Sequence, residues 1–97
     1  MPQKKRNRKP PHRHITLRGQ KWRMKTRRVD DEDRGECIRA EKTITIDPDL
    51  TSFDRMDTII HECLHGCFRD IEEDAIDPTA TDIAQVLWDD GWRRIQE

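Results

Sequence analysis

The stretch from residue 51 to residue 69 constrains the fold of this chain more than any other part of the sequence. Its apolar side chains recur at intervals of three and four residues, which places them along one face of an α-helix. They are Phe53, Met56, Ile59, Ile60, Cys63, Leu64 and Cys67. Thr51 followed by Asp54 is typical of a capping box, so the helix should begin near Thr51. Because Gly66 weakens the last turn, we expect the helix to end before Asp70.

This predicted helix carries a His-Glu-x-x-His sequence at residues 61–65. His61 and His65 are four residues apart, so their imidazoles lie one above the other and can bind one ion. Zinc lowers the pKa of a bound water, and Glu62 is placed to act as the general base for that water. On a helical wheel with His61 at 0°, His65 falls at about 40°, Glu62 at about 100°, and the apolar sector spans about 160° to 340°. The histidines therefore lie at the rim of the buried face.

The three cysteines are an odd number, which favours free thiols or metal ligands over a disulfide framework. Cys63 and Cys67 fall near 200° and about 240° on the same wheel, within the apolar sector and opposite the histidines. We therefore predict that both are core thiols. For Cys37 a packed thiol is favoured, and a ligand role stays open.

A catalytic zinc needs a third protein ligand and one open position. The next candidates along the chain are Asp70, Glu72, Glu73, Asp74 and Asp77, although acids are also common at helix N-termini for electrostatic reasons. A second helix is predicted from about Glu72 to Asp90, with Ile76, Ile83, Val86 and Leu87 facing inward. Pro78 allows two interpretations, a kinked helix or a new helix that Asp77 caps.

The residues before these helices predict strands. Ile15–Leu17, Trp22–Met24 and Lys42–Asp47 alternate apolar or β-branched residues with polar ones, and residues 30–35 form a polar loop between strands. Residues 1–14 contain three prolines and six cations, so we expect a disordered basic tail before one α+β domain at residues 15–97. Only 32% of the chain is hydrophobic and 40% is charged, so the core must be small and a bound metal would help to stabilise it.

The net charge of −1 hides a strong asymmetry. Residues 1–28 contain twelve Lys and Arg and no acid, whereas the rest of the chain contains seven basic and twenty acidic residues. A basic arm of this kind can bind DNA or RNA non-specifically, or it can act as a solubilising tail or associate with the acidic body. The candidate nucleic-acid contacts are Lys4, Lys5, Arg6, Arg8, Lys9 and Arg13. We find no apolar run of membrane-spanning length and no signal peptide, so we expect a cytoplasmic protein.

Residues 43–91 resemble zincin metallopeptidases, in particular the gluzincin branch and the small metallopeptidase-like proteins encoded by phages and prophages. The matching parts are Gly35-Glu36-Cys37 as a strand entry, the strand Thr43–Asp47, the His61–His65 motif and the acidic turn at Asp70–Ile76. The closing segment Leu87–Trp92 is similar as well. The resemblance implies a small zincin-like fold, with a short antiparallel or mixed sheet, an active-site helix and a C-terminal helix.

The resemblance also implies the roles of individual residues. One Zn²⁺ per chain would be bound by His61, His65 and Glu73, with Glu72 as the competitor for the third position. Glu62 would be the catalytic base, and Asp77 would orient a ligand histidine. A substrate peptide would pair with an edge strand, Lys42–Asp47, through Thr43, Ile44, Thr45 and Ile46.

Two functions are compatible with these features. The first is a zinc metallopeptidase that hydrolyses peptide bonds of a protein or peptide substrate through a Glu62-activated, metal-bound water. The second is a non-catalytic zinc-binding module with a zincin fold, associated with nucleic acid through the basic arm. The chain contains no Tyr, which many zincins use to stabilise the oxyanion, so His14, Arg39 or a main-chain amide would have to supply this group.

Overall fold

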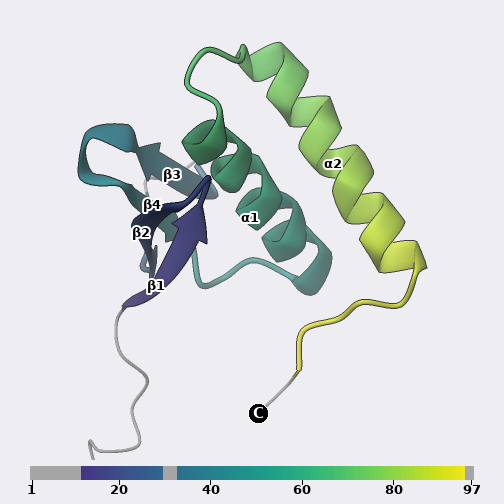
Figure 1. Cartoon of the computed structure of the whole chain (residues 1–97). Helices are drawn as coiled ribbons and strands as arrows, with labels where there is room; N and C mark the ends of the chain where they lie inside the picture. The colour runs from purple at the N-terminus through teal and green to yellow at the C-terminus, as the bar shows by residue number, and fades with distance from the viewer. Residues whose placement is uncertain (1–11, 30–32, 96–97) are drawn as a thin grey trace, which may run out of the picture.

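The computed structural model describes residues 12–29 and 33–95, and it has the predicted α+β architecture (Figure 1). In chain order the elements are β1 (His12–Leu17), β2 (Gln20–Thr26), β3 (Gly35–Ile38), a short 3-10 helix (Arg39–Glu41), β4 (Thr43–Ile46), α1 (Ser52–Cys67) and α2 (Glu73–Asp89). One side of α1 packs on β3 and β4 and another on α2, so α1 lies between the sheet and α2. None of the described helices is long and apolar enough to cross a membrane.

The four strands form a mixed sheet in the order β1-β2-β4-β3. β1 and β2 form an antiparallel hairpin, β2 runs parallel to β4, and β4 is antiparallel to β3. At the turn of the hairpin, Arg18 and Gly19 both have positive φ, 48° and 79°, as the central residues of a type I′ turn require. The strands predicted at Ile15–Leu17 and Trp22–Met24 are confirmed, and so is the mixed sheet.

The prediction that Thr43–Ile46 is an edge strand is wrong. β4 lies inside the sheet, because Ile44 pairs with Met24 of β2 on one side and with Cys37 of β3 on the other. Neighbouring strands therefore use the main-chain groups that a substrate would need. The residues of β4, all of them buried, are Thr43, Ile44, Thr45 and Ile46. The edge strand beside α1 is β3.

The predicted basic tail extends too far along the chain. His12, Arg13 and His14 form the first half of β1 and pair with Lys25, Met24 and Arg23 of β2, respectively. These residues extend β1 because β2 is long enough to pair with residues that precede Ile15. Residues 1–11 of the predicted tail lie outside the described residues.

The main core lies between the sheet and α1. Trp22, Met24, Ile44 and Ile46 are its buried members, and the half-buried residues that pack against them are Ile15, Leu17, Cys37, Leu50, Ile59 and Cys63. Burial, with smaller contributions from the nearby thiols Cys67 and Cys37, raises the pKa of Cys63 to about 11. All three cysteines are free. Cys63 is thus a core thiol as predicted, and Cys67 is half-buried.

The first helix agrees with the prediction in its extent but not in its capping. α1 begins at Ser52 and ends at Cys67, and Thr51 occupies the N-cap position. The Thr51 side chain makes no capping hydrogen bond, so the predicted capping box does not form. The acidic side chain expected to complete it, Asp54, instead lies 3.7 Å from a guanidinium nitrogen of Arg34.

The second helix is continuous through Pro78, because a proline near the first turns removes only one main-chain hydrogen bond. Its buried residues are Ile76, Ala80 and Ala84, each four residues after the last. Ile83 is 40% exposed and Val86 is 67% exposed, so the prediction that these two side chains face inward is wrong. The small alanine side chains let α2 pack closely against α1.

Candidate metal centre

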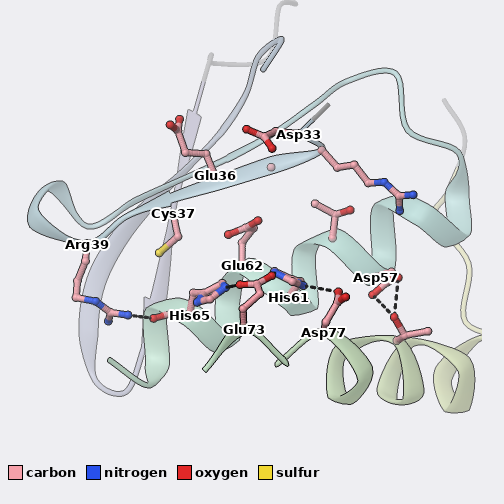
Figure 2. Close-up of a pocket in the computed structure, with 14 residues that line it drawn as sticks. Asp33, Glu36, Cys37, Arg39, Asp57, His61, Glu62, His65, Glu73 and Asp77 are labelled. Atoms are coloured by element: carbon pink, nitrogen blue, oxygen red, sulfur yellow. Dashed lines mark hydrogen bonds and ion pairs between the residues drawn. The ribbon is translucent and has the colours of Figure 1, made fainter. Parts of the chain in front are cut away.

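Three of the predicted ligands lie together between α1 and α2 (Figure 2). The ring centroids of His61 and His65 are 5.0 Å apart on one face of α1. Glu73, the first residue of α2, extends its carboxylate to both rings. Its two oxygens lie 2.9 Å from Nε2 of His61 and 2.8 Å from Nε2 of His65. Glu72 precedes the helix and is not a member of this group.

The chemistry of this donor set fits a zinc ion. Two imidazole nitrogens and one carboxylate oxygen are ordinary zinc ligands, and neighbouring ligand atoms of a tetrahedral zinc lie about 3.3 Å apart. The nitrogen–oxygen distances here are slightly shorter, 2.8 and 2.9 Å. The Glu73 side chain is 64% exposed, so packing does not fix the position of its carboxylate.

The described residues supply three candidate ligands and not four. Within residues 12–29 and 33–95, no further His, Cys, Asp or Glu joins His61, His65 and Glu73 as a ligand group. Cys37 lines the same pocket but does not belong to the group. Three protein ligands leave one tetrahedral position for water or substrate, which is the arrangement of catalytic rather than structural zinc.

Glu62 lines the same pocket and is buried, with 8% of its surface exposed. Burial raises the pKa of its carboxyl group, His61 and His65 partly oppose this shift, and the nearby acids Glu73 and Asp33 add to it. A carboxylate with a raised pKa accepts a proton more readily near neutral pH, as a general base must. Figure 2 shows the Glu62 carboxylate between α1 and the strand β3.

Gly35 explains how β3 can approach Glu62 so closely. A Cβ atom on Gly35 would lie 2.8 Å from Cγ2 of Thr58, 3.0 Å from the main-chain oxygen of Thr45 and 3.1 Å from Cγ of Glu62. These distances are shorter than normal van der Waals contacts. The glycine therefore lets the edge strand cross directly over the helix at the residue predicted to be the base.

Asp77, for which the resemblance implies a role in orienting a ligand histidine, lies beside His61. Its Oδ1 is 3.5 Å from Nδ1 of His61, while Nε2 of the same ring faces Glu73. The two ring nitrogens of His61 thus have different partners. This is the arrangement expected of a carboxylate that orients a ligand histidine.

The pocket has a volume of about 650 Å³, and several of the residues that line it are not predicted from the sequence as site residues. They are Asp33, Arg34, Glu36, Asp57, Thr58 and Thr81. Asp57 precedes His61 by four residues, so helical spacing alone could have placed it on the histidine face. Thr81 donates its hydroxyl to the Asp57 carboxylate, with oxygen–oxygen distances of 3.0 and 3.2 Å. This contact joins the two helices, and nothing in the sequence indicates it.

The structure separates the two side chains considered for oxyanion stabilisation. Arg39 lines the pocket, but its guanidinium donates to the main-chain oxygens of His65, Gly66 and Phe68 and so caps the end of α1. His14 lies on β1, at the opposite edge of the sheet from β3, and does not line the pocket. Arg39 therefore lies in the pocket but is engaged by the end of α1, and His14 lies outside the pocket.

Of the six candidate nucleic-acid residues, only Arg13 lies within the described residues. Arg13 is exposed on β1, at the edge of the sheet far from the histidines. Those outside the described residues are Lys4, Lys5, Arg6, Arg8 and Lys9.

Comparison with known proteins identifies no relative of this chain. No protein-family model, no curated protein and no solved structure matches it. The functional interpretation therefore depends on the residues of the site and on the resemblance of its motif.

Proposed function

We propose that this chain is a zinc-dependent metallopeptidase with a zincin-like domain. One observation supports this above all others: His61, His65 and Glu73 converge in the pocket that contains the buried carboxylate of Glu62. A purely structural zinc site has no use for a buried acid beside an incomplete ligand set, because it is normally closed by a fourth ligand.

Each residue has a separate role in this proposal. The zinc ion, when bound, acts as a Lewis acid and lowers the pKa of water. Glu62 accepts a proton from the attacking water and donates it to the departing amine, so the peptide bond is cleaved with no net change in the protonation of the enzyme. Asp77 holds the His61 ring with Nε2 toward the ligand position.

The substrate strand in this proposal is β3 in place of the buried β4. Among the described residues β3 pairs only with β4, so its other edge offers main-chain groups to an extended peptide. Gly35, Glu36 and Cys37 of this strand line the pocket. A peptide that pairs there passes over Glu62 and the histidines (Figure 2).

The lining of the pocket favours a substrate with a positively charged side chain. Besides Glu62 and Glu73, four acids line it, Asp33, Glu36, Asp57 and Asp77. The arginines of the pocket are engaged, Arg39 by the end of α1 and Arg34 by Asp54. Acidic side chains around a cleft attract a cationic substrate and disfavour an acidic one.

Zinc content tests the metal site directly. We expect about one zinc per chain in protein purified without chelators, loss of zinc in His61→Ala, and weaker binding in Glu73→Gln. Glu72→Gln is the matched control, since Glu72 lies one residue away and outside the ligand group. A wild-type chain that neither contains zinc nor binds added zinc would disprove the proposal.

Peptidase activity then separates the two candidate functions. Quenched fluorescent peptides with a central Lys or Arg should be cleaved by the zinc-loaded wild type and not by Glu62→Gln, which should retain its zinc. Zinc binding without cleavage of any peptide pool would instead indicate the zinc-binding module.

A further inference from the structure

A second cavity lies apart from the metal centre. It has a volume of about 770 Å³ and shares no lining residue with the pocket of the histidines. Its walls come from β1, β2, the first turns of α1, the end of α2 and the segment after α2. We term this cavity the arginine groove, and the residues that define it are Arg13, Arg55, Arg94, Met56, Ile59 and Ile60.

The floor of the arginine groove is apolar and largely aliphatic. α1 supplies Met56, Ile59 and Ile60, and the sheet supplies Met24. Trp88 closes one end and makes an edge-to-face contact with Phe53 at a centroid distance of 5.4 Å. At the rim, Trp92 is 61% exposed. A cavity of this size and lining is suited to apolar groups of a ligand.

The rim of the groove is positively charged, since four arginines line it. Arg93 stacks on Trp88, with its guanidinium carbon 3.4 Å from the ring centroid. Burial and the neighbouring cations Arg94 and Arg13 lower the pKa of Arg55. Among the described residues, no carboxylate lies within ion-pair distance of Arg13, Arg55 or Arg94.

This positive charge is a local property of the surface. Beyond residue 28 the chain has twenty acidic and seven basic residues, and the other large pocket is lined by acids. Three arginines therefore line an apolar floor, and within residues 12–29 and 33–95 none of them has a carboxylate partner. An anion bound among these arginines would relieve the repulsion between them.

Charge and floor chemistry together select the occupant. The chain's own N-terminal arm is excluded, because residues 1–11 carry five cations and no acid. A single-stranded nucleic acid would satisfy the arginines, but it binds by stacking its bases on aromatic platforms, and here the floor is mainly Met and Ile. An acidic polypeptide with aliphatic side chains matches both the rim and the floor.

We propose that the arginine groove is a docking site for a segment of a partner protein that combines aliphatic side chains with Asp or Glu. The aliphatic side chains bind on Met56, Ile59 and Ile60. The carboxylates pair with Arg55, Arg94 and Arg13. The site is independent of the metal centre and does not depend on the proposed peptidase activity.

A displayed library of random peptides, selected on the immobilised full-length chain, tests this chemistry without a known partner. The selected peptides should be enriched in Asp and Glu together with Leu, Ile, Met or Phe. Fluorescence anisotropy of one selected peptide should then show affinity about tenfold weaker for each of Arg55→Gln and Arg94→Gln. Arg69→Gln is the matched control, because Arg69 is exposed and lines neither cavity.

Stability measurements separate docking from a structural role. Since Arg55 and Arg94 repel each other, Arg55→Gln should leave the thermal midpoint unchanged or raise it while peptide affinity falls. Selected peptides without acids, no enrichment at all, or binding that survives both substitutions would overturn the proposal. So would an oligonucleotide that displaces the peptide and depends on Arg55, or a dimer of this chain that the same substitutions abolish.

Discussion

Substitution of Gly35 by alanine should destabilise the protein, although alanine is usually the more stabilising residue. The φ angle of Gly35 is not positive, so the main chain itself accepts a side chain. The obstacle is space, because the new Cβ would lie 2.8 Å from Cγ2 of Thr58, 3.0 Å from the oxygen of Thr45 and 3.1 Å from Cγ of Glu62.

The size of the effect follows from two opposing contributions. Extra atoms in a packed interior cost about 1–3 kcal/mol, and here neither neighbour can move easily. Thr58 is 5% exposed, and the Thr45 oxygen belongs to the central strand β4. Replacing glycine by alanine also reduces the conformational freedom of the unfolded chain, which stabilises the folded protein by about 0.4–1 kcal/mol. We expect a net loss of about 1–2 kcal/mol, which lowers the melting temperature of a domain of this size by roughly 5–15 °C.

A double-mutant cycle with Thr58→Ser measures this contact. Thr58→Ser removes the methyl group nearest to the new Cβ and alone costs about 1 kcal/mol through lost burial. In that background Gly35→Ala should cost less, with a favourable coupling of about 0.5–1 kcal/mol in urea-unfolding experiments. A neutral or stabilising Gly35→Ala, or the same cost in both backgrounds, would refute the argument that β3 and α1 are in direct contact at this point.

Three further predictions concern the proposed general base Glu62, the buried face of α2, and Asp47, which follows β4. Glu62→Gln should lower peptidase activity about 10²–10⁴-fold without loss of zinc, measured by cleavage rate and metal content on the same sample. Ile76→Ala should cost about 2–5 kcal/mol in urea unfolding, whereas Val86→Ala should stay within about 0.5 kcal/mol; equal costs would contradict the helix orientation. Two main-chain N–H groups donate to the Asp47 carboxylate and lower its pKa. The hydrogen-bonded Asp47 carboxylate therefore stabilises the fold fully above the pKa that it has in the unfolded chain, and this stabilisation is lost as the pH falls through its lower pKa in the folded protein. The loss of stability caused by Asp47→Asn should therefore be smaller at acidic pH, as measured by thermal melts.

Local patterns in the sequence predicted most of the elements. The three-and-four spacing of residues 53–67 gave the extent of α1, and the alternation in residues 22–24 and 43–46 gave β2 and β4. The order of the strands was not predictable in this way, because alternation shows which residues form a strand but not which strands become its neighbours. The placement of β4 at an edge came from the resemblance. All four residues of β4 are apolar or β-branched, and such a strand is better suited to the interior of a sheet.

The unresolved choice between Glu72 and Glu73 and the misassigned face of α2 have one physical cause. The predicted inward residues, Ile76, Ile83, Val86 and Leu87, define a helix face whose centre lies about 20° from Glu72 and about 80° from Glu73. The observed face, with Ala80 and Ala84 in place of Ile83 and Val86, shifts this centre to about 25° from Glu73 and about 75° from Glu72. Hydrophobicity favours the larger side chains for burial, but the two helices that bring Glu73 to the histidines pack closely, and alanine permits the closest approach. The side chains that allow α2 to pack against α1 are thus the ones that turn Glu73 toward the histidines.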